Sequence, residues 1–230
     1  MTLSQPYPQK KELQNATTYR RMWLDFCLEQ HSHDMRGVVI DLGGKQKNKR
    51  GSFHPPETQA KAWWYVNLEM STRPNIFSDV TAAPLISECA DVIICTEVLE
   101  HLENPDTCAD EIFRILRPGG KAFISVPFIY PIHADPNDFQ RFTAEGLRRL
   151  FRRFAIIEIM PMGGFLGTMG MLLEIGIQGI TGQGIDKKIL RRFLYGLAAC
   201  RRERFYCQNV LFWPSNWAES APNATLKAQI

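Results

Sequence analysis

The sequence predicts a three-layer α/β fold built around a mostly parallel sheet, and two observations support this prediction. Apolar segments of strand length alternate with helical patterns along the chain, as they do in β-α-β units. The stretch DVIICTEVLEHLENPDTCADEIFRILRPGG, residues 91–120, contains one such unit, with a buried strand, a polar segment, a helix and a turn. Right-handed crossovers between such units place helices on both faces of a parallel sheet.

The strands of the sheet are expected at six apolar runs that end in polar or turn-forming residues. These runs are 38–40, 63–68, 76–80, 92–95, 122–126 and 155–159. The Pro-Gly-Gly sequence at 118–120 is expected to form a turn before the fifth strand. Because polar groups at the carboxyl ends of parallel strands gather at one edge of the sheet, that edge is the expected ligand site.

Helices are predicted between these strands and before the first one. Large apolar residues recur at helical spacing between 19 and 27, which predicts an amphipathic helix that covers one edge of the sheet. Asn104 is expected to cap a helix that has Pro105 in its first position. Thr143 is the expected N-cap of a helix over 144–153.

A chain of 230 residues fits one domain with additions. Residues 1–16 are expected to form a flexible arm, 17–162 the α/β core, and 163–230 a helical C-terminal insertion that completes the same domain. The apolar segment 163–180 is only 18 residues long and contains Glu174 and several glycines. These features favour a buried or lid helix over the substrate pocket rather than a membrane span.

Composition indicates which cellular compartment and which kinds of binding partner are expected. The net charge of +3 is too small to indicate nucleic acid, and the scattered cysteines favour a reducing cytoplasm. No His, Cys or Asp cluster has the spacing of metal ligands, so no metal is expected. Pairs of basic residues between 187 and 204 follow the apolar segment, which suits peripheral contact with an anionic membrane at its inner face.

The motifs EVLEHL and RILRPGG, with the apolar strand that follows them, resemble the central segment of class I S-adenosylmethionine (SAM)-dependent methyltransferases. The resemblance extends over about 38–154. It implies a Rossmann-like seven-stranded sheet, SAM as the cofactor, and a final strand within 206–213 that pairs antiparallel at the sheet edge. The absence of a G-x-G-x-x-G sequence disfavours a nicotinamide-dependent Rossmann enzyme.

The resemblance assigns the start of the cofactor site to the turn after the first strand. Asp41, Gly43 and Gly44 match the acidic, glycine-rich first motif of the family, in which backbone approaches the ligand. Lys45 and Lys47 depart from it, because further glycines are common there. This departure keeps open an inactive methyltransferase fold that serves as a binding or scaffold protein.

Further cofactor contacts are expected at the ends of the next strands. Glu69 is placed to accept both ribose hydroxyls, with Asn67 as a nearby substitute. Asp79 matches the family position beside the adenine amino group, and the Val80 amide would bind a ring nitrogen; a short Asx turn is the competing interpretation of Asp79. The residues expected beside the methionine end of SAM are Thr96 and Glu97.

The basic loop KQKNKRGSFHPP, residues 45–56, has three interpretations. A charge run is usually a solvated loop. Its lysines would otherwise pair with the cofactor carboxylate or bind phosphates of a substrate such as a nucleotide- or lipid-linked glycan. The hypothesis preferred is phosphate binding, with Lys47, Lys49 and Arg50 as the substrate-binding residues.

The loop 127–143 resembles the PFxYPxHxxPxDxxRxT pattern of methyltransferases associated with glycan and cell-envelope pathways. A hydroxyl acceptor benefits from a base, so His133 is the first catalytic candidate, with Asp135 or Asp138 to orient or replace it. The alternative is that His133, Asp138 and Arg141 form a hydrogen-bond network that holds the loop shut. The remaining assignments are Tyr130 and Arg141 for substrate and His101 for a bracing or catalytic role.

Together these features predict a SAM-dependent methyltransferase that acts on a small-molecule or glycan hydroxyl. Nucleic-acid methylation is disfavoured by the modest charge and by the lack of a base-flipping motif. The oligomeric state cannot be inferred from these patterns.

Overall fold

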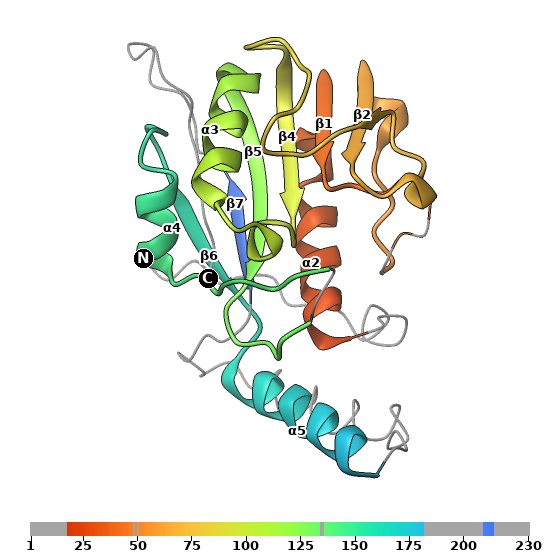
Figure 1. Ribbon diagram of the computed structural model, residues 1–230, viewed down its shortest axis with the longest axis vertical. Helices are drawn as coiled ribbons and strands as arrows, with labels where there is room; N and C mark the ends of the chain where they lie inside the picture. The colour runs from red at the N-terminus through yellow and green to blue at the C-terminus, as the bar shows by residue number, and fades with distance from the viewer. Residues whose placement is uncertain (1–17, 48, 50, 134–135, 182–208, 214–230) are drawn as a thin grey trace.

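The computed structural model describes residues 18–47, 49, 51–133, 136–181 and 209–213 (Figure 1). The strands are β1 (Val38–Leu42), β2 (Ala62–Asn67), β3 (Ile76–Phe77), β4 (Ala90–Thr96), β5 (Leu116–Pro127), β6 (Glu158–Met162) and β7 (Asn209–Trp213). The helices are α2 (Tyr19–Gln30), α3 (Pro105–Ile115), α4 (Ala144–Leu150) and α5 (Phe165–Thr181). The expected arm at 1–16 lies outside the described residues.

The described strands form one sheet in the order β3-β2-β1-β4-β5-β7-β6. Pairing is parallel from β3 through β5, whereas β7 runs antiparallel to both β5 and β6. The predicted α/β, Rossmann-like, mostly parallel fold class is therefore confirmed. The antiparallel strand itself does not lie at the edge as expected, because β6 pairs outside it.

The two faces of the sheet are covered by different helices. Side chains alternate between faces along a strand, so neighbouring Val39 and Ile40 enter separate hydrophobic clusters. Ile40 lies with α3 and α4, and Val39 lies with α2. The N-terminal helix thus covers a face of the sheet and not its edge, which corrects the sequence prediction.

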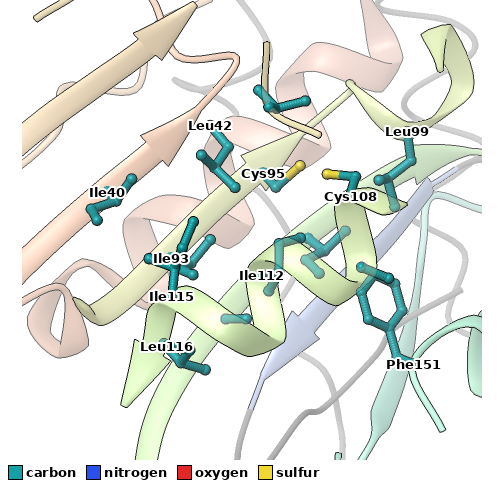
Figure 2. Close-up of a cluster of buried hydrophobic side chains, with 14 of the residues drawn as sticks. Ile40, Leu42, Ile93, Cys95, Leu99, Cys108, Ile112, Ile115, Leu116 and Phe151 are labelled. Carbon is teal, nitrogen blue, oxygen red and sulfur yellow. The ribbon is translucent and has the colours of Figure 1, made fainter. Parts of the chain in front are cut away.

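The cluster under α3 forms the larger core (Figure 2). Ile112 and Ile115 of α3 are fully buried against Ile93 of β4. Cys95 and Cys108, expected in the core, are also fully buried, and Figure 2 shows their sulfur atoms pointing toward one another. The hydrogen bond to Cys108 and burial raise the pKa of the Cys95 thiol. Both side chains pack in this cluster as small apolar groups.

Several element boundaries differ from the sequence prediction. The Pro-Gly-Gly sequence does not precede β5 but lies within it, where the β4–β5 register shifts between Ala90 and Val92. Gly119 has φ +76°, a value that glycine adopts without steric cost. This irregularity absorbs residues that an uninterrupted ladder would have to pair.

Other boundaries move by a few residues. The third strand is only Ile76–Phe77, α4 ends at Leu150, and β6 begins at Glu158. Thr143 caps α4 as expected, because its hydroxyl accepts a hydrogen bond from the Gly146 amide at 3.1 Å. Asn104 makes no side-chain cap to α3, although Pro105 occupies the first turn as expected.

Helix α5 lies beyond the end of the sheet, at the bottom of Figure 1. Its Met171 joins the cluster that α2 forms with the sheet, so α5 is attached to the body through α2. Phe165, Met169 and Leu173 follow one another at four-residue intervals and are 42%, 51% and 54% exposed. Within the described residues, no helix combines the length and the apolarity that a membrane crossing requires.

Candidate functional site

A cavity of about 1040 Å³ opens at the carboxyl ends of the parallel strands. All nine residues that the sequence assigned to the cofactor contribute to its lining: Asp41, Gly43, Gly44, Asn67, Glu69, Asp79, Val80, Thr96 and Glu97. Four further predicted site residues line it as well: Lys49, His101, Tyr130 and His133. Strand ends far apart in the sequence thus meet at one site, as the parallel topology requires.

The turn after β1 is held by its neighbours on β2 and β4. The Gly43 amide donates to the Val66 carbonyl at 2.8 Å, and Gly43 has φ +78°. A Cβ at this position would collide with the Val98 side chain. Glycine is therefore needed both for the backbone conformation and for the close approach of the strand end.

Asn67 supports this turn and does not simply duplicate Glu69. Its side-chain amide donates to the carbonyls of Gly43 at 2.9 Å and Gly44 at 3.0 Å. Its oxygen accepts from the Glu69 amide at 2.8 Å. Asn67 therefore fixes the glycine turn and the start of the Glu69 segment in one geometry.

The carboxylate of Glu69 is paired with Lys45 at 2.8 Å. The Glu69 side chain is 51% exposed, so this is a solvated ion pair that a ligand can rearrange. Lys45 thus departs from the glycine pattern, but it contacts Glu69, the residue that is predicted to bind the ribose hydroxyls. No local pattern predicts this pair, because the two residues are 24 positions apart.

Asp79 adopts the competing arrangement considered for it. Its Oδ1 accepts hydrogen bonds from the amide and the hydroxyl of Thr81, each at 2.8 Å. This is an Asx turn, and Asp79 also lines the cavity. The adjacent Val80 is 7% exposed and packs in the core below.

Glu97 occupies a strained position at the tip of β4. It has φ +58°, which is uncommon outside glycine, and its amide donates to the Ser125 carbonyl at 2.9 Å. One carboxylate oxygen accepts from the Ser125 hydroxyl at 2.9 Å, and the other pairs with Arg20 of α2. The Arg20 guanidinium also lies over the Tyr130 ring, 4.3 Å from its centroid.

Arg20 was missed by the sequence analysis. It is one of two adjacent arginines on α2, and only the apolar face of this helix has a recognisable sequence pattern. Its place in the site depends on α2 crossing the face of the sheet, which no local pattern specifies.

The basic loop is anchored at several points, which departs from a freely solvated loop. The Ser52 amide donates to the buried Asp25 carboxylate at 2.5 Å, and the Lys47 amide donates to the Thr72 carbonyl at 2.8 Å. Lys49 donates to the Tyr65 hydroxyl at 3.0 Å and lines the cavity. Arg50 lies outside the described residues.

The described residues of the loop 127–143 form the expected hydrogen-bond network among His133, Asp138 and Arg141. Asp138 accepts from the His133 amide at 2.8 Å and lies 3.2 Å from His133 Nδ1. Arg141 binds the same carboxylate through both terminal nitrogens and donates to the carbonyls of Tyr130 and Pro131. These hydrogen bonds hold the pKa of Asp138 well below its usual range. Arg141 therefore braces the loop and does not line the cavity, and Asp135 lies outside the described residues.

A second brace links this loop to the segment after β4. His101 Nδ1 lies 2.5 Å from the Asn137 carbonyl, and the Phe139 amide donates to the Glu100 carbonyl at 2.8 Å. The His101 and His133 rings meet edge to face with centroids 5.0 Å apart. Glu100 is fully buried beneath them.

Burial shifts the pKa values of two acids and one base around the cavity. It raises the pKa of Asp41 to about 7, against the lowering effect of Lys49 and Arg21. It raises the pKa of Glu100 to about 7 as well. Burial, together with the nearby Arg20 charge, lowers the pKa of His133. Such clustering of shifted groups is typical of functional sites.

Comparison with known proteins identifies the fold to which this site belongs. A family model described as "Methyltransferase domain" matches residues 63–124. Two structures of phosphoethanolamine N-methyltransferase 2 from Haemonchus contortus, one bound to SAM and one to phosphomonomethylethanolamine and S-adenosylhomocysteine, superpose with TM-scores of 0.51 and 0.52. They are 12% and 13% identical to this chain over 81% of its length, and the match covers 50% and 51% of theirs.

The YcgJ protein from Bacillus subtilis superposes with a TM-score of 0.50 at 11% identity, over 82% of this chain and 95% of its own. A search of curated protein sequences returned no significant match. The chain spans about half the length of the Haemonchus structures. The identities are low, so these superpositions show a shared fold.

Proposed function

We propose that this chain, which has the class I methyltransferase fold and a methyltransferase-domain match over 63–124, is a SAM-dependent methyltransferase. The proposed acceptor is a hydroxyl of a small molecule or glycan. The observation that carries the proposal is the convergence of nine predicted cofactor residues on one cavity at the carboxyl edge of the sheet.

The residues present fit the parts of SAM. Glu69 offers an exposed carboxylate for the ribose hydroxyls, and Asp79, whose Oδ1 binds Thr81, lines the same cavity. Glu97 is held between Ser125 and Arg20 at the strand tip. A carboxylate there favours a sulfonium or ammonium group that takes over part of its pairing with Arg20. SAM, when bound, supplies a methyl group that is already activated on sulfur.

The chain's own contribution is therefore alignment and proton removal. With SAM bound, the acceptor oxygen would bond to the methyl carbon as the carbon–sulfur bond breaks toward sulfur, and His133 would accept the hydroxyl proton. Among the predicted catalytic residues, His133 presents its ring at the cavity while Asp138, bound by Arg141, orients it. Asp135 and His101 keep supporting roles in this proposal.

Titration calorimetry with SAM, S-adenosylhomocysteine and NAD tests this proposal. We expect binding of the first two and none of NAD. A Glu69→Gln variant should bind SAM about tenfold more weakly, because it loses a charged acceptor for the ribose, about 1.4 kcal/mol. The matched control is Glu103→Gln, since Glu103 lines the same cavity but has no assigned contact with SAM.

Two results would contradict the proposal. Absence of binding to both SAM and S-adenosylhomocysteine would favour an inactive fold that serves as a scaffold. Binding of NAD alone would favour a nicotinamide-dependent enzyme.

The basic loop is proposed to bind phosphate groups of the acceptor. Lys49 reaches the cavity, and the loop backbone is anchored at Asp25 and Thr72, so its charges are held beside the site. Lys45 pairs with Glu69 at 2.8 Å, and Lys49 pairs with Glu57 at 3.4 Å. The residues proposed for phosphate binding are Lys47, Lys49 and Arg50, with a phosphate replacing Glu57 as the partner of Lys49. A built cationic loop of this kind suits a nucleotide- or lipid-linked substrate.

Replacing Lys47, Lys49 and Arg50 together by alanine should weaken binding of inorganic pyrophosphate at least tenfold and leave SAM affinity unchanged. Calorimetry with each ligand measures both. The control variant changes Arg148, Arg149 and Arg152, three exposed arginines at α4, to alanine. A loss of SAM binding in the loop variant would instead place the lysines at the cofactor.

We propose that α5 makes peripheral contact with the inner face of a membrane. Its exposed stripe of Phe165, Met169 and Leu173 supports it, because such a stripe can enter the headgroup region of a bilayer. Co-sedimentation with anionic liposomes should fall when Met169 and Leu173 are changed to serine. Equal sedimentation of this variant would remove the membrane proposal and leave the protein in the cytoplasm.

A further inference from the structure

Glu100 is a buried carboxylate whose environment the methyl-transfer proposal does not explain. Its side chain is 0% exposed, and neither of its carboxylate oxygens has a hydrogen-bond partner. A buried carboxylate without such partners is costly, and proteins usually satisfy one with a donor, a counter-charge or a metal ion. Among the basic side chains of the described residues, two imidazoles lie within 4.0 Å of it.

Both imidazoles present the same nitrogen to Glu100. His101 Nε2 lies 3.8 Å and His133 Nε2 lies 4.0 Å from Glu100 Oε1. The three donor atoms lie within 4.8 Å of one another. The cluster combines two neutral-capable nitrogen ligands with one oxygen ligand, which is a common set for catalytic divalent metal ions.

The opposite nitrogen of each ring is held by a separate partner. His101 Nδ1 lies 2.5 Å from the Asn137 carbonyl. His133 Nδ1 hydrogen-bonds the Pro131 carbonyl at 3.3 Å and also lies 3.2 Å from the Asp138 carboxylate. A proton on each Nδ1 leaves the Nε2 lone pair directed at Glu100. Metal-binding histidines show this arrangement, in which the outer hydrogen bond fixes the tautomer and the ring. The brace described above thus also prepares two ligands.

We propose that Glu100, His101 and His133 bind one divalent transition-metal ion, with Zn²⁺ as the expected occupant. Zinc–nitrogen and zinc–oxygen bonds of about 2.1 Å require donor atoms about 3.4 Å apart, so closure needs side-chain shifts of roughly 1 Å. Nitrogen-rich sites favour zinc, cobalt or iron, whereas magnesium and calcium prefer oxygen ligands. The sequence predicted no metal because His133 is 32 positions from His101, outside any linear ligand spacing.

The proposed metal site borders the cavity. His101 and His133 both line the cavity, so a ligand in the cavity can reach the ion. If the proposed function holds, an acceptor hydroxyl can occupy one of them, and coordination lowers the pKa of that hydroxyl. His133 then serves as a ligand, and the hydroxyl proton leaves to solvent. Metal binding itself does not depend on this role.

The test is metal binding by the full chain, freed of metal with EDTA and studied without SAM or acceptor. Calorimetry with Zn²⁺ and the visible absorption of added Co²⁺ should show one ion per chain. His133→Ala and Glu100→Gln should each weaken binding at least 100-fold. The control is His33→Ala, which changes an exposed histidine outside the cavity and should bind as the parent does.

A further variant tests the acid beside His133, which Arg141 also binds. Asp138→Asn keeps the shape of the side chain but removes the charge behind His133, and should weaken Zn²⁺ binding about 10- to 100-fold. Equal affinity in the parent, Glu100→Gln and Asp138→Asn, or no stoichiometric binding by the parent, would overturn the proposal. SAM calorimetry on the same EDTA-treated protein separates this failure from failure of the methyltransferase proposal.

Discussion

The carboxylates around the cavity differ in what surrounds them, and this decides which of them can meet a ligand. Glu69 is half exposed in an ion pair with Lys45, whereas Glu97 is held between Ser125 and Arg20. Asp79 has one oxygen committed to Thr81. A cationic ligand therefore meets acids that differ in exposure. Glu69 and Asp79 are exposed after β2 and β3, whereas the inner acid, Asp41, lies near the end of β1.

The inner acid, Asp41, predicts a pH dependence of stability. Burial raises its pKa to about 7, well above the ordinary value of about 3.9 for aspartate. Between these two values the folded chain binds more protons than the unfolded chain, so the free energy of unfolding falls as pH rises from about 4 through 7. Urea denaturation of the parent should therefore show lower stability at pH 8 than at pH 5.

Asp41→Asn should reduce this slope by removing the group that titrates. Some slope will remain, because burial raises the pKa of Glu100 to about 7 as well. An unchanged slope in Asp41→Asn would contradict the assignment to Asp41.

Among the elements of the fold, backbone segments approach one another most closely where strands end. The glycine turn after β1 is built from hydrogen bonds to β2, and its left-handed Gly43 fits beneath Val98 of the segment after β4. Three elements thus depend on one residue without a side chain.

Gly43→Ala should destabilise the fold by about 1–3 kcal/mol, because alanine is strained at φ +78° and its Cβ collides with Val98. Chemical denaturation measures the change. The control is Gly176→Ala in α5, where an added Cβ meets nothing within 4 Å. Helical Gly→Ala should be neutral or stabilise by about 0.5–1 kcal/mol. Equal stability of both variants would show that the turn tolerates a side chain.

Elements with strong local signals were predicted well. The buried strands β1, β2 and β4 follow from continuous apolar runs, and α4 begins at its predicted cap Thr143. The turn predicted at the Pro-Gly-Gly sequence is wrong, because these residues form an irregularity inside β5. Helix α2 was placed at an edge because an amphipathic pattern specifies one apolar face but not which surface it covers.

For the molecule as a whole, parallel topology brings the predicted cofactor residues together, and this followed from the sequence because each lies at a strand end. Contacts between distant segments did not follow. The pairing of Arg20 with Glu97 and the convergence of His101 and His133 on Glu100 depend on how helices and loops pack after the sheet has formed.

The most direct test of the central claim is a crystal structure of the chain grown with saturating S-adenosylhomocysteine. We predict density in the cavity with the ribose hydroxyls on Glu69, the adenine beside Asp79, and the amino-acid end near the glycine turn and Glu97. An empty cavity, or density for the ligand elsewhere on the molecule, would contradict the claim that this strand edge is a SAM site.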